Sequence, residues 1–113
     1  MTDRRGDVVA TLFPFADGVS AKKRPALICA GPWRVTSTIE VCWVVMITTT
    51  ILKGWPGDLK VPDPTTAGLP VPSIIRTLKL ACIDTRNITR TIGTLDKATL
   101  AAVQRNIQKR LRG

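Results

Sequence analysis

The 113-residue sequence contains no histidine and no tyrosine. Histidine is the side chain that most often transfers protons near neutral pH, and it is the commonest metal ligand in proteins. Its absence excludes the usual acid–base pairs and most metal sites. The chain also lacks a glycine-rich phosphate loop of the Walker type and a Gly-x-Ser-x-Gly elbow. The sequence therefore contains neither of the motifs by which nucleotide hydrolases of the Walker type and serine hydrolases are recognised.

Cysteine is scarce as well. Cys29, Cys42 and Cys82 are odd in number, far apart in the sequence and surrounded by apolar residues. This pattern argues against a disulfide framework and against a zinc site, and it predicts buried, structural thiols. We therefore expect neither a metal nor a cofactor.

No apolar run is long enough to cross a membrane. The longest, residues 41–47, is far shorter than the roughly 20 residues that a spanning helix needs. The apolar stretch at residues 8–12, which follows Arg4 and Arg5, is too short and too interrupted for an export signal. We therefore expect a cytoplasmic protein that does not enter the membrane.

Acidic residues are few compared with basic ones. Lys and Arg number 17 and Asp and Glu number 8, which gives a formal net charge of +9. Such a surplus attracts polyanions, so nucleic acid or an acidic protein is the expected partner, with a basic surface kept only for solubility as the alternative. Since 44% of the residues are hydrophobic and the length suits one core, we expect a single domain over residues 1–113.

The chain does contain short apolar runs rich in Val, Ile and Thr, separated by Gly, Pro and Asp, which is the pattern of strands and turns. The run at residues 39–48 is apolar on both faces, so we expect it to be covered on both sides, as a central strand under a helix or at a homodimer interface. Strands are predicted near Asp7–Leu12, Ala26–Ala30, Ile39–Thr48, Leu59–Val61, Ser73–Leu78 and Ile88–Ile92.

Two later segments of the chain differ from this strand pattern. Residues 53–72 contain prolines at positions 56, 62, 64, 70 and 72, which predicts an extended loop that is either a binding element or simply flexible. After it, apolar residues recur at helical spacing and predict one amphipathic helix over about residues 97–112. Asp96 is its expected N-cap, and basic residues occupy its C-terminal end.

Five short signatures follow one another along the chain. They are Arg5-Gly6-Asp7-Val8-Val9, Phe13-Pro14-Phe15, Lys23-Arg24-Pro25-Ala26-Leu27, Ile47-Thr48-Thr49 and Ile92-Gly93-Thr94-Leu95. In this order they resemble the MazF/PemK family, toxins of type II toxin–antitoxin systems that cut messenger RNA. The resemblance extends from Arg5 to about Leu111. It implies a mainly β fold: a small SH3-like barrel over about residues 5–93, shared with CcdB toxins, and a C-terminal helix over about residues 97–112.

The active site of this family consists of an Arg that opens the second strand and a Thr that ends the third. The corresponding residues here are Arg24 and Thr48. Such a pair can suffice because the nucleophile in RNA cleavage is the substrate's own 2′-hydroxyl, which leaves the protein to orient the phosphate and stabilise its charge. Without the resemblance, Arg24 could equally cap a turn, and Thr48 could be an ordinary strand residue.

The resemblance also implies an RNA groove bordered by the loop before Arg24 and by the loop after the third strand. Trp33 and Trp55 fall in predicted loops, where they could stack on unpaired bases, anchor a partner peptide or be partly buried. Arg76 aligns with an Arg implicated in some relatives, although the Asp two residues later in those relatives is Leu78 here. The predicted RNA contacts are Lys22, Lys23, Thr49, Lys53, Arg76, Trp33 and Trp55.

The activity that the resemblance implies is metal-independent, sequence-specific cleavage of single-stranded mRNA to 2′,3′-cyclic phosphate and 5′-hydroxyl ends. It further implies a homodimer that is neutralised by a cognate acidic antitoxin. Two alternatives belong to other classes: a CcdB-like toxin that poisons DNA gyrase through protein contacts, and a non-catalytic relative that binds RNA or antitoxin. The Arg24 and Thr48 motifs favour the ribonuclease.

Overall fold

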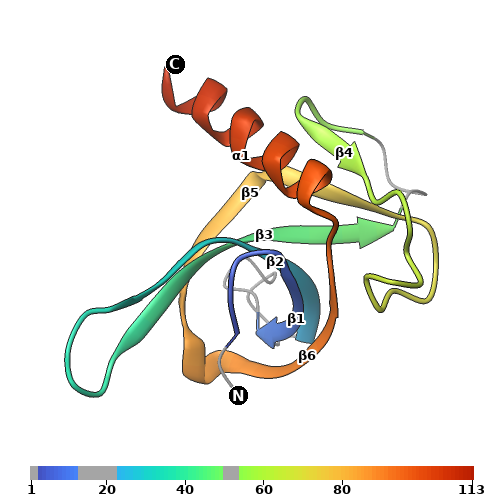
Figure 1. Ribbon diagram of the computed structural model, residues 1–113. Coiled ribbons are helices and arrows are strands. Elements are labelled where there is room, and N and C mark those ends of the chain that lie inside the picture. The colour runs from blue at the N-terminus through green and yellow to red at the C-terminus, as the bar shows by residue number, and fades with distance from the viewer. Residues whose placement is uncertain (1–2, 13–22, 50–53) are drawn as a thin grey trace, which may run out of the picture.

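The computed structural model describes residues 3–12, 23–49 and 54–113 (Figure 1). Every strand predicted from the sequence is present in these residues, as is the C-terminal helix. The strands are β1 (Asp7–Leu12), β2 (Lys23–Arg34), β3 (Glu40–Thr49), β4 (Asp58–Lys60), β5 (Ser73–Asp84) and β6 (Ile88–Thr94). The helices are the short 3-10 helix η1 (Thr85–Asn87) and α1 (Lys97–Leu111).

The strands form one antiparallel sheet in the order β4-β5-β3-β2-β1-β6. The sheet curls strongly, and the chain passes from β5 through η1 into β6, which pairs with β1 (Figure 1). Since β4 and β6 each have a neighbour on one side only, hydrogen bonds do not close the sheet into a complete barrel. The predicted mainly β fold with a C-terminal helix is confirmed, with an open sheet.

β3 lies at the centre of the sheet, between β5 and β2. On one face, Val45 and Ile47 belong to a core cluster that includes side chains from α1. On the other face, Cys42, Val44 and Met46 belong to a second core cluster with residues of β1, β2 and β5. The prediction that this run is a central strand covered on both sides is therefore confirmed.

α1 packs across one face of the sheet (Figure 1). Val103 and Ile107 are its apolar side chains in the core. Asp96 is the N-cap, as predicted, because its carboxylate accepts hydrogen bonds of 2.9 Å from the backbone N–H and from the hydroxyl of Thr99. These bonds, the hydroxyl's first, hold the pKa of Asp96 below its ordinary value of 3.8. No helix in the described part of the chain is long and apolar enough to span a membrane.

Two strands are longer than their patterns predict. β2 continues past Ala30 to Arg34 because shifts of register against β3 accommodate Gly31 and Pro32 within the strand. β5 continues past Leu78 to Asp84 because a second shift of register lets pairing with β3 resume at Leu80. Sequence patterns do not reveal such bulges, since the bulge depends on the partner strand.

One cysteine departs from its prediction. Cys29 and Cys42 are buried, and burial raises the pKa of each thiol to about 12. Cys82 is instead exposed. It lies opposite Trp43 in the β3–β5 pair, and Trp43 is itself 36% exposed, so other elements leave this part of the sheet uncovered.

Candidate functional site

Arg24 and Thr48 lie at the same end of the sheet. Arg24 is the second residue of β2, and Thr48 is the last residue but one of β3. The pairing between these strands reaches Ala26 opposite Met46, and Arg24 and Thr48 each lie two residues beyond this last pair, on the same face as their neighbours in it. Opposite residues of an antiparallel pair project to the same face. The fold therefore brings the two predicted catalytic residues to one edge and one side of the sheet.

Arg24 is exposed, and the acidic side chains of the described residues are engaged elsewhere. Each of these carboxylates accepts a hydrogen bond or pairs with a cation at another position: Asp3, Asp7, Glu40, Asp58, Asp63, Asp84 and Asp96. Asp17 lies outside the described residues. Within them, the guanidinium of Arg24 has no carboxylate partner, and no group of three or more acidic, His or Cys side chains could hold a metal ion.

A cavity of about 540 Å³ lies beside Arg24, and we call it the Arg24 pocket. Ala10 of β1 pairs with Pro25 of β2 on one side and with Arg90 of β6 on the other, so these residues form a row across three strands. The small side chain of Ala10 leaves a hollow in the middle of this row. The other lining residues are Lys23, Arg24, Gly68, Leu69, Pro70, Thr89 and Ile92.

The proline-rich segment forms one wall of the Arg24 pocket. Gly68 approaches β6 so closely that a Cβ on it would lie 1.8 Å from the carbonyl oxygen of Ile92. A Cβ on Gly93 would likewise lie 2.2 Å from the carbonyl carbon of Ala67. Ala67 and Leu69 are buried in the core. The wall therefore packs tightly against β6, and only glycine fits at positions 68 and 93.

Comparison with known proteins identifies the family. A family model of PemK-like, MazF-like toxins of type II toxin–antitoxin systems matches residues 4–111. The chain belongs to this family. No curated protein sequence matches the toxin.

Solved structures agree with the family in fold. The Mycobacterium tuberculosis toxin MazF-mt6 is 22% identical, with a TM-score of 0.65 over 94% of this chain and 96% of that one. MazF from Deinococcus radiodurans is 18% identical, with a TM-score of 0.71 over 100% and 99%. An endoribonuclease in complex with its cognate antitoxin, from a mycobacterial species, is 18% identical, with a TM-score of 0.71 over 98% and 96%.

The predicted RNA contacts of the toxin are only partly gathered around Arg24. Lys23 is exposed and lines the Arg24 pocket, and Thr49 is half-buried next to Thr48. Lys22 and Lys53 lie outside the described residues. The remaining three predicted contacts, Arg76, Trp55 and Trp33, belong to two other parts of the fold.

Arg76 and Trp55 form a cluster with Asp58 at the β4 edge of the sheet. Arg76 is 3% exposed, and one of its guanidinium nitrogens lies 2.9 Å from a carboxylate oxygen of Asp58. The guanidinium carbon lies 4.3 Å from the centre of the Trp55 ring, which is itself 41% exposed in a loop, as predicted. Asp58 also accepts a hydrogen bond from the backbone N–H of Trp55. Because Arg76 is buried in this ion pair, we assign it a structural role.

Trp33 is not in a loop, contrary to the prediction. It lies in β2, and at 3.3 Å per residue it is roughly 30 Å along the strand from Arg24. It packs edge to face on Trp43, with 5.5 Å between the ring centres. Trp33 therefore belongs to the β2–β3 hairpin, which projects away from the Arg24 end of the sheet (Figure 1).

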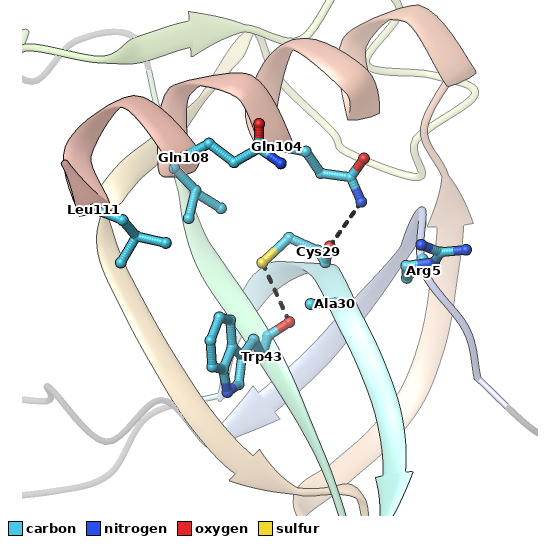
Figure 2. A pocket seen from close by; sticks show the side chains of 8 residues that line it. Arg5, Cys29, Ala30, Trp43, Gln104, Gln108 and Leu111 are labelled. Atoms are coloured by element: carbon cyan, nitrogen blue, oxygen red, sulfur yellow. Dashed lines mark hydrogen bonds between the residues drawn. The ribbon is translucent and has the colours of Figure 1, made fainter.

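A second cavity, of about 370 Å³, lies between α1 and strands β2 and β3 (Figure 2). The amide of Gln104 donates a 3.0 Å hydrogen bond to the carbonyl of Cys29, whose thiol donates to the carbonyl of Trp43 at 3.4 Å. With its pKa raised to about 12 by burial, the Cys29 thiol stays protonated and is a poor nucleophile. The lining also includes Arg5, whose side chain is exposed (Figure 2).

Proposed function

We propose that this toxin is an endoribonuclease that cuts single-stranded messenger RNA without a metal ion, with Arg24 and Thr48 as its catalytic residues. The observation that carries the proposal is the setting of Arg24. It is an exposed guanidinium at the same edge of the sheet as Thr48, beside a cavity with two further cations, Lys23 and Arg90. Membership of the MazF-like toxin family supports the same activity.

The proposed reaction uses the substrate as its own nucleophile. The 2′-oxygen attacks the adjacent phosphorus as its proton passes to water, and the bond from phosphorus to the 5′-oxygen breaks as that oxygen takes up a proton from water. The products are a 2′,3′-cyclic phosphate and a 5′-hydroxyl. Arg24 stabilises the charge on two phosphate oxygens, and Thr48 donates one more hydrogen bond. Because the pKa of a guanidinium is so high, Arg24 acts through its charge and not by transferring a proton.

Several further residues are proposed to hold the RNA strand. Lys23 binds phosphate at the Arg24 pocket, and Thr49 extends the polar edge beside Thr48. Lys22 and Lys53 are proposed phosphate contacts on the grounds of sequence alone. Trp55 is 41% exposed, and an unpaired base is proposed to pack on the exposed part of its ring.

The partners proposed for this toxin are a second copy of itself and a cognate acidic antitoxin in the cytoplasm. The net charge of +9 is complementary to an acidic protein as well as to RNA. A structurally similar endoribonuclease has been solved in complex with its cognate antitoxin, which supports a partner of this kind.

The first test is cleavage of mixed-sequence single-stranded RNA in the presence of a metal chelator. We expect the wild-type toxin to cut at a recurring short motif and to leave cyclic-phosphate ends. Arg24→Ala should lower the rate at least about 100-fold, since removing one donor to a developing oxyanion typically has an effect of that size. Arg24→Lys should keep part of the activity, because it retains the charge but loses the two-pronged geometry.

Three outcomes would contradict the proposal. Intact RNA from a folded wild-type toxin would favour a gyrase poison or a non-catalytic binder. Undiminished cutting by Arg24→Ala would remove Arg24 from the active site. Unfolding of Arg24→Ala, measured by circular dichroism, would show that the residue is structural.

A further inference from the structure

We propose that Asn106 of α1 is a positioning residue for catalysis. Through the carbonyl of Gly57 it holds the far end of the loop that leaves β3 directly after Thr48 and Thr49, and thereby keeps the Thr48 hydroxyl in place for the phosphate. The inference rests on the proposed ribonuclease function. Asn106 belongs to none of the family signatures in the sequence, and it acts through Gly57 and not by contact with RNA.

The loop between β3 and β4 ends in a tight turn over residues 55–58. The backbone N–H of Asp58 donates to the carbonyl of Trp55 at 3.2 Å, and the Asp58 carboxylate accepts from the N–H of Trp55 at 2.8 Å. Pro56 and Gly57 occupy the two central positions, and Gly57 has a φ of 83°. Proline followed by a glycine of positive φ is the combination that a type II turn favours. The local sequence therefore builds the turn that leads into β4.

The carbonyl oxygen of Gly57 joins this turn to two other elements. The hydroxyl of Thr77 in β5 donates to it at 2.9 Å, and the side-chain amide of Asn106 in α1 donates to it at 3.1 Å. A carbonyl has two lone pairs, so one oxygen can accept both bonds. We call Gly57, Thr77 and Asn106 the Gly57 clamp. A Cβ on residue 57 would lie 2.7 Å from the hydroxyl oxygen of Thr77, so this close approach requires glycine.

The Gly57 clamp stabilises a part of the sheet that strand pairing holds weakly. β4 has three residues and pairs with β5 on one side only. Such a short edge strand makes few ladder hydrogen bonds, and few bonds oppose its local opening. Thr77 is 3% exposed and Asn106 is half-buried, so water competes for their two bonds less than it would at the surface. The bond from Asn106 therefore fixes the start of β4 against α1, which lies beside it in Figure 1.

Thr48 is linked to the Gly57 clamp both through the sheet and along the chain. Thr48 pairs with Ile74 of β5, and Ile74 pairs with Lys60 of β4, so these three residues form one row across the strands. Thr48 is also the last residue but one of β3, and the chain that leaves this strand enters β4 through the turn that the clamp holds. An opening of β4 therefore loosens the end of β3 in two ways.

Catalysis depends closely on where the Thr48 hydroxyl lies. A hydrogen bond weakens steeply as its angle departs from linearity, and a misplacement of about 1 Å can lower a catalytic rate about 100-fold. Loss of one bond of the clamp loosens the edge of the sheet only in part. We therefore expect Asn106→Ala to lower kcat about tenfold and to change KM less than about twofold.

The test measures kcat and KM on a short single-stranded RNA for the wild-type toxin and three variants. Asn106→Asp keeps the size of the side chain but has no N–H to donate, so it should lose as much kcat as Asn106→Ala. Gln108→Ala is the matched control, because it removes an amide from an exposed position on the same helix. It should keep the wild-type values.

A double-mutant cycle shows whether Asn106 acts through Thr48. In the Thr48→Ala background, the rate of single-turnover cleavage should be insensitive to Asn106→Ala, since the hydroxyl that Asn106 positions is gone. A tenfold loss that persists in that background would overturn the inference. A merely structural role gives such persistence, because a loosened fold impairs both backgrounds equally.

Amide hydrogen exchange supplies a second readout that needs no catalysis. Asn106→Ala should speed exchange at Thr48 and Thr49 at least about fivefold relative to Gln108→Ala, because the end of β3 opens more often. Exchange at Leu27, in the core, should be unchanged. If circular dichroism shows that Asn106→Ala does not fold, Thr77→Val takes its place in both measurements. It removes the other bond to the same oxygen, and unchanged kcat and exchange would overturn the inference.

The outcomes separate this inference from the proposed function. If wild-type toxin cuts RNA and Asn106→Ala matches Gln108→Ala in kcat and in exchange at Thr48, the positioning role is wrong and the ribonuclease stands. If wild-type toxin does not cut RNA but Asn106→Ala speeds exchange at Thr48, the ribonuclease is wrong and the link from α1 to Thr48 stands.

Discussion

Arg76 illustrates how one side chain can change its role once its neighbours are known. In the sequence it aligns with an Arg implicated in some relatives and is a predicted RNA contact. In the structure its side chain is 4% exposed and that of Asp58 is 12% exposed, so their ion pair is largely shielded from water. The pair also ties β4 to β5 at the edge of the sheet. A cation held in this way stabilises the fold and is not placed to bind a phosphate.

We therefore expect Asp58→Ala to be strongly destabilising. Removing one partner of a buried ion pair leaves the other charge uncompensated, which typically costs about 3–5 kcal/mol. The free energy of unfolding, measured in urea at a fixed protein concentration, should fall by roughly 3 kcal/mol. Glu40→Ala is the control, because it breaks the exposed pair with Arg34 and should cost at most about 1 kcal/mol. Equal losses from the two substitutions would contradict a structural role for the Asp58–Arg76 pair.

α1 is the element whose limits are best explained by local chemistry. Asp96 satisfies a free amide at its start, and Lys109 and Arg110 lie in its last turn, where positive charge is favourable. Asp96→Ala should lower the free energy of unfolding by about 1 kcal/mol, the usual value of an N-cap. Urea unfolding measures this loss, and Ala98→Ser, at an exposed position in the first turn, serves as a control outside the cap.

The same cap makes a prediction about pH. The pKa of Asp96 in the folded toxin lies below 3.8, chiefly because the Thr99 hydroxyl donates to the carboxylate. A lowered pKa means that the stabilisation is complete above 3.8 and is lost as the pH falls through the folded value. Asp96→Asn keeps a capping oxygen without the titration. The stability difference between wild type and Asp96→Asn should therefore shrink when urea unfolding is repeated well below pH 3.8. A difference that stays constant would show that the ionised form contributes nothing.

For the molecule as a whole, the placement of the few carboxylates matters as much as the net charge of +9. The carboxylates of the described residues cap turns, cap the helix or pair with other side chains. None of them lines the Arg24 pocket. Lys23, Arg24 and Arg90 consequently form a local cationic surface at one end of the sheet. Such a surface binds RNA by releasing counterions, which makes the affinity depend on salt.

We expect the affinity of wild-type toxin for 2′-O-methylated single-stranded RNA to fall steeply with ionic strength. Three phosphate contacts at about 0.7 each give a slope near −2, so a fourfold rise in salt should weaken binding roughly 20-fold. Fluorescence anisotropy measures this directly. A slope near zero would contradict the proposal that these three cations bind the phosphates of the strand.

The elements of this toxin follow from short-range patterns in its sequence. Alternating Val, Ile and Thr runs predict the strands, apolar residues from Leu100 onward predict α1, and Asp96 predicts its start. Arg24 and Thr48 could also be found in the sequence, because each lies in a short motif of the family. These features can be predicted because backbone geometry and capping depend on residues only a few positions apart.

Other features depend on contacts between distant parts of the chain, and no local pattern encodes them. Arg90 and Ala10 are about eighty residues apart, and only their pairing brings Arg90 to the lining of the Arg24 pocket. The exposure of Cys82 depends on what covers its sheet face, and the ion pair of Arg76 depends on the return of β4 to β5. The sequence therefore determined the strands, the helix and the catalytic candidates, whereas tertiary packing decided which cations surround the pocket, because burial and cross-strand neighbours arise only when the sheet has formed.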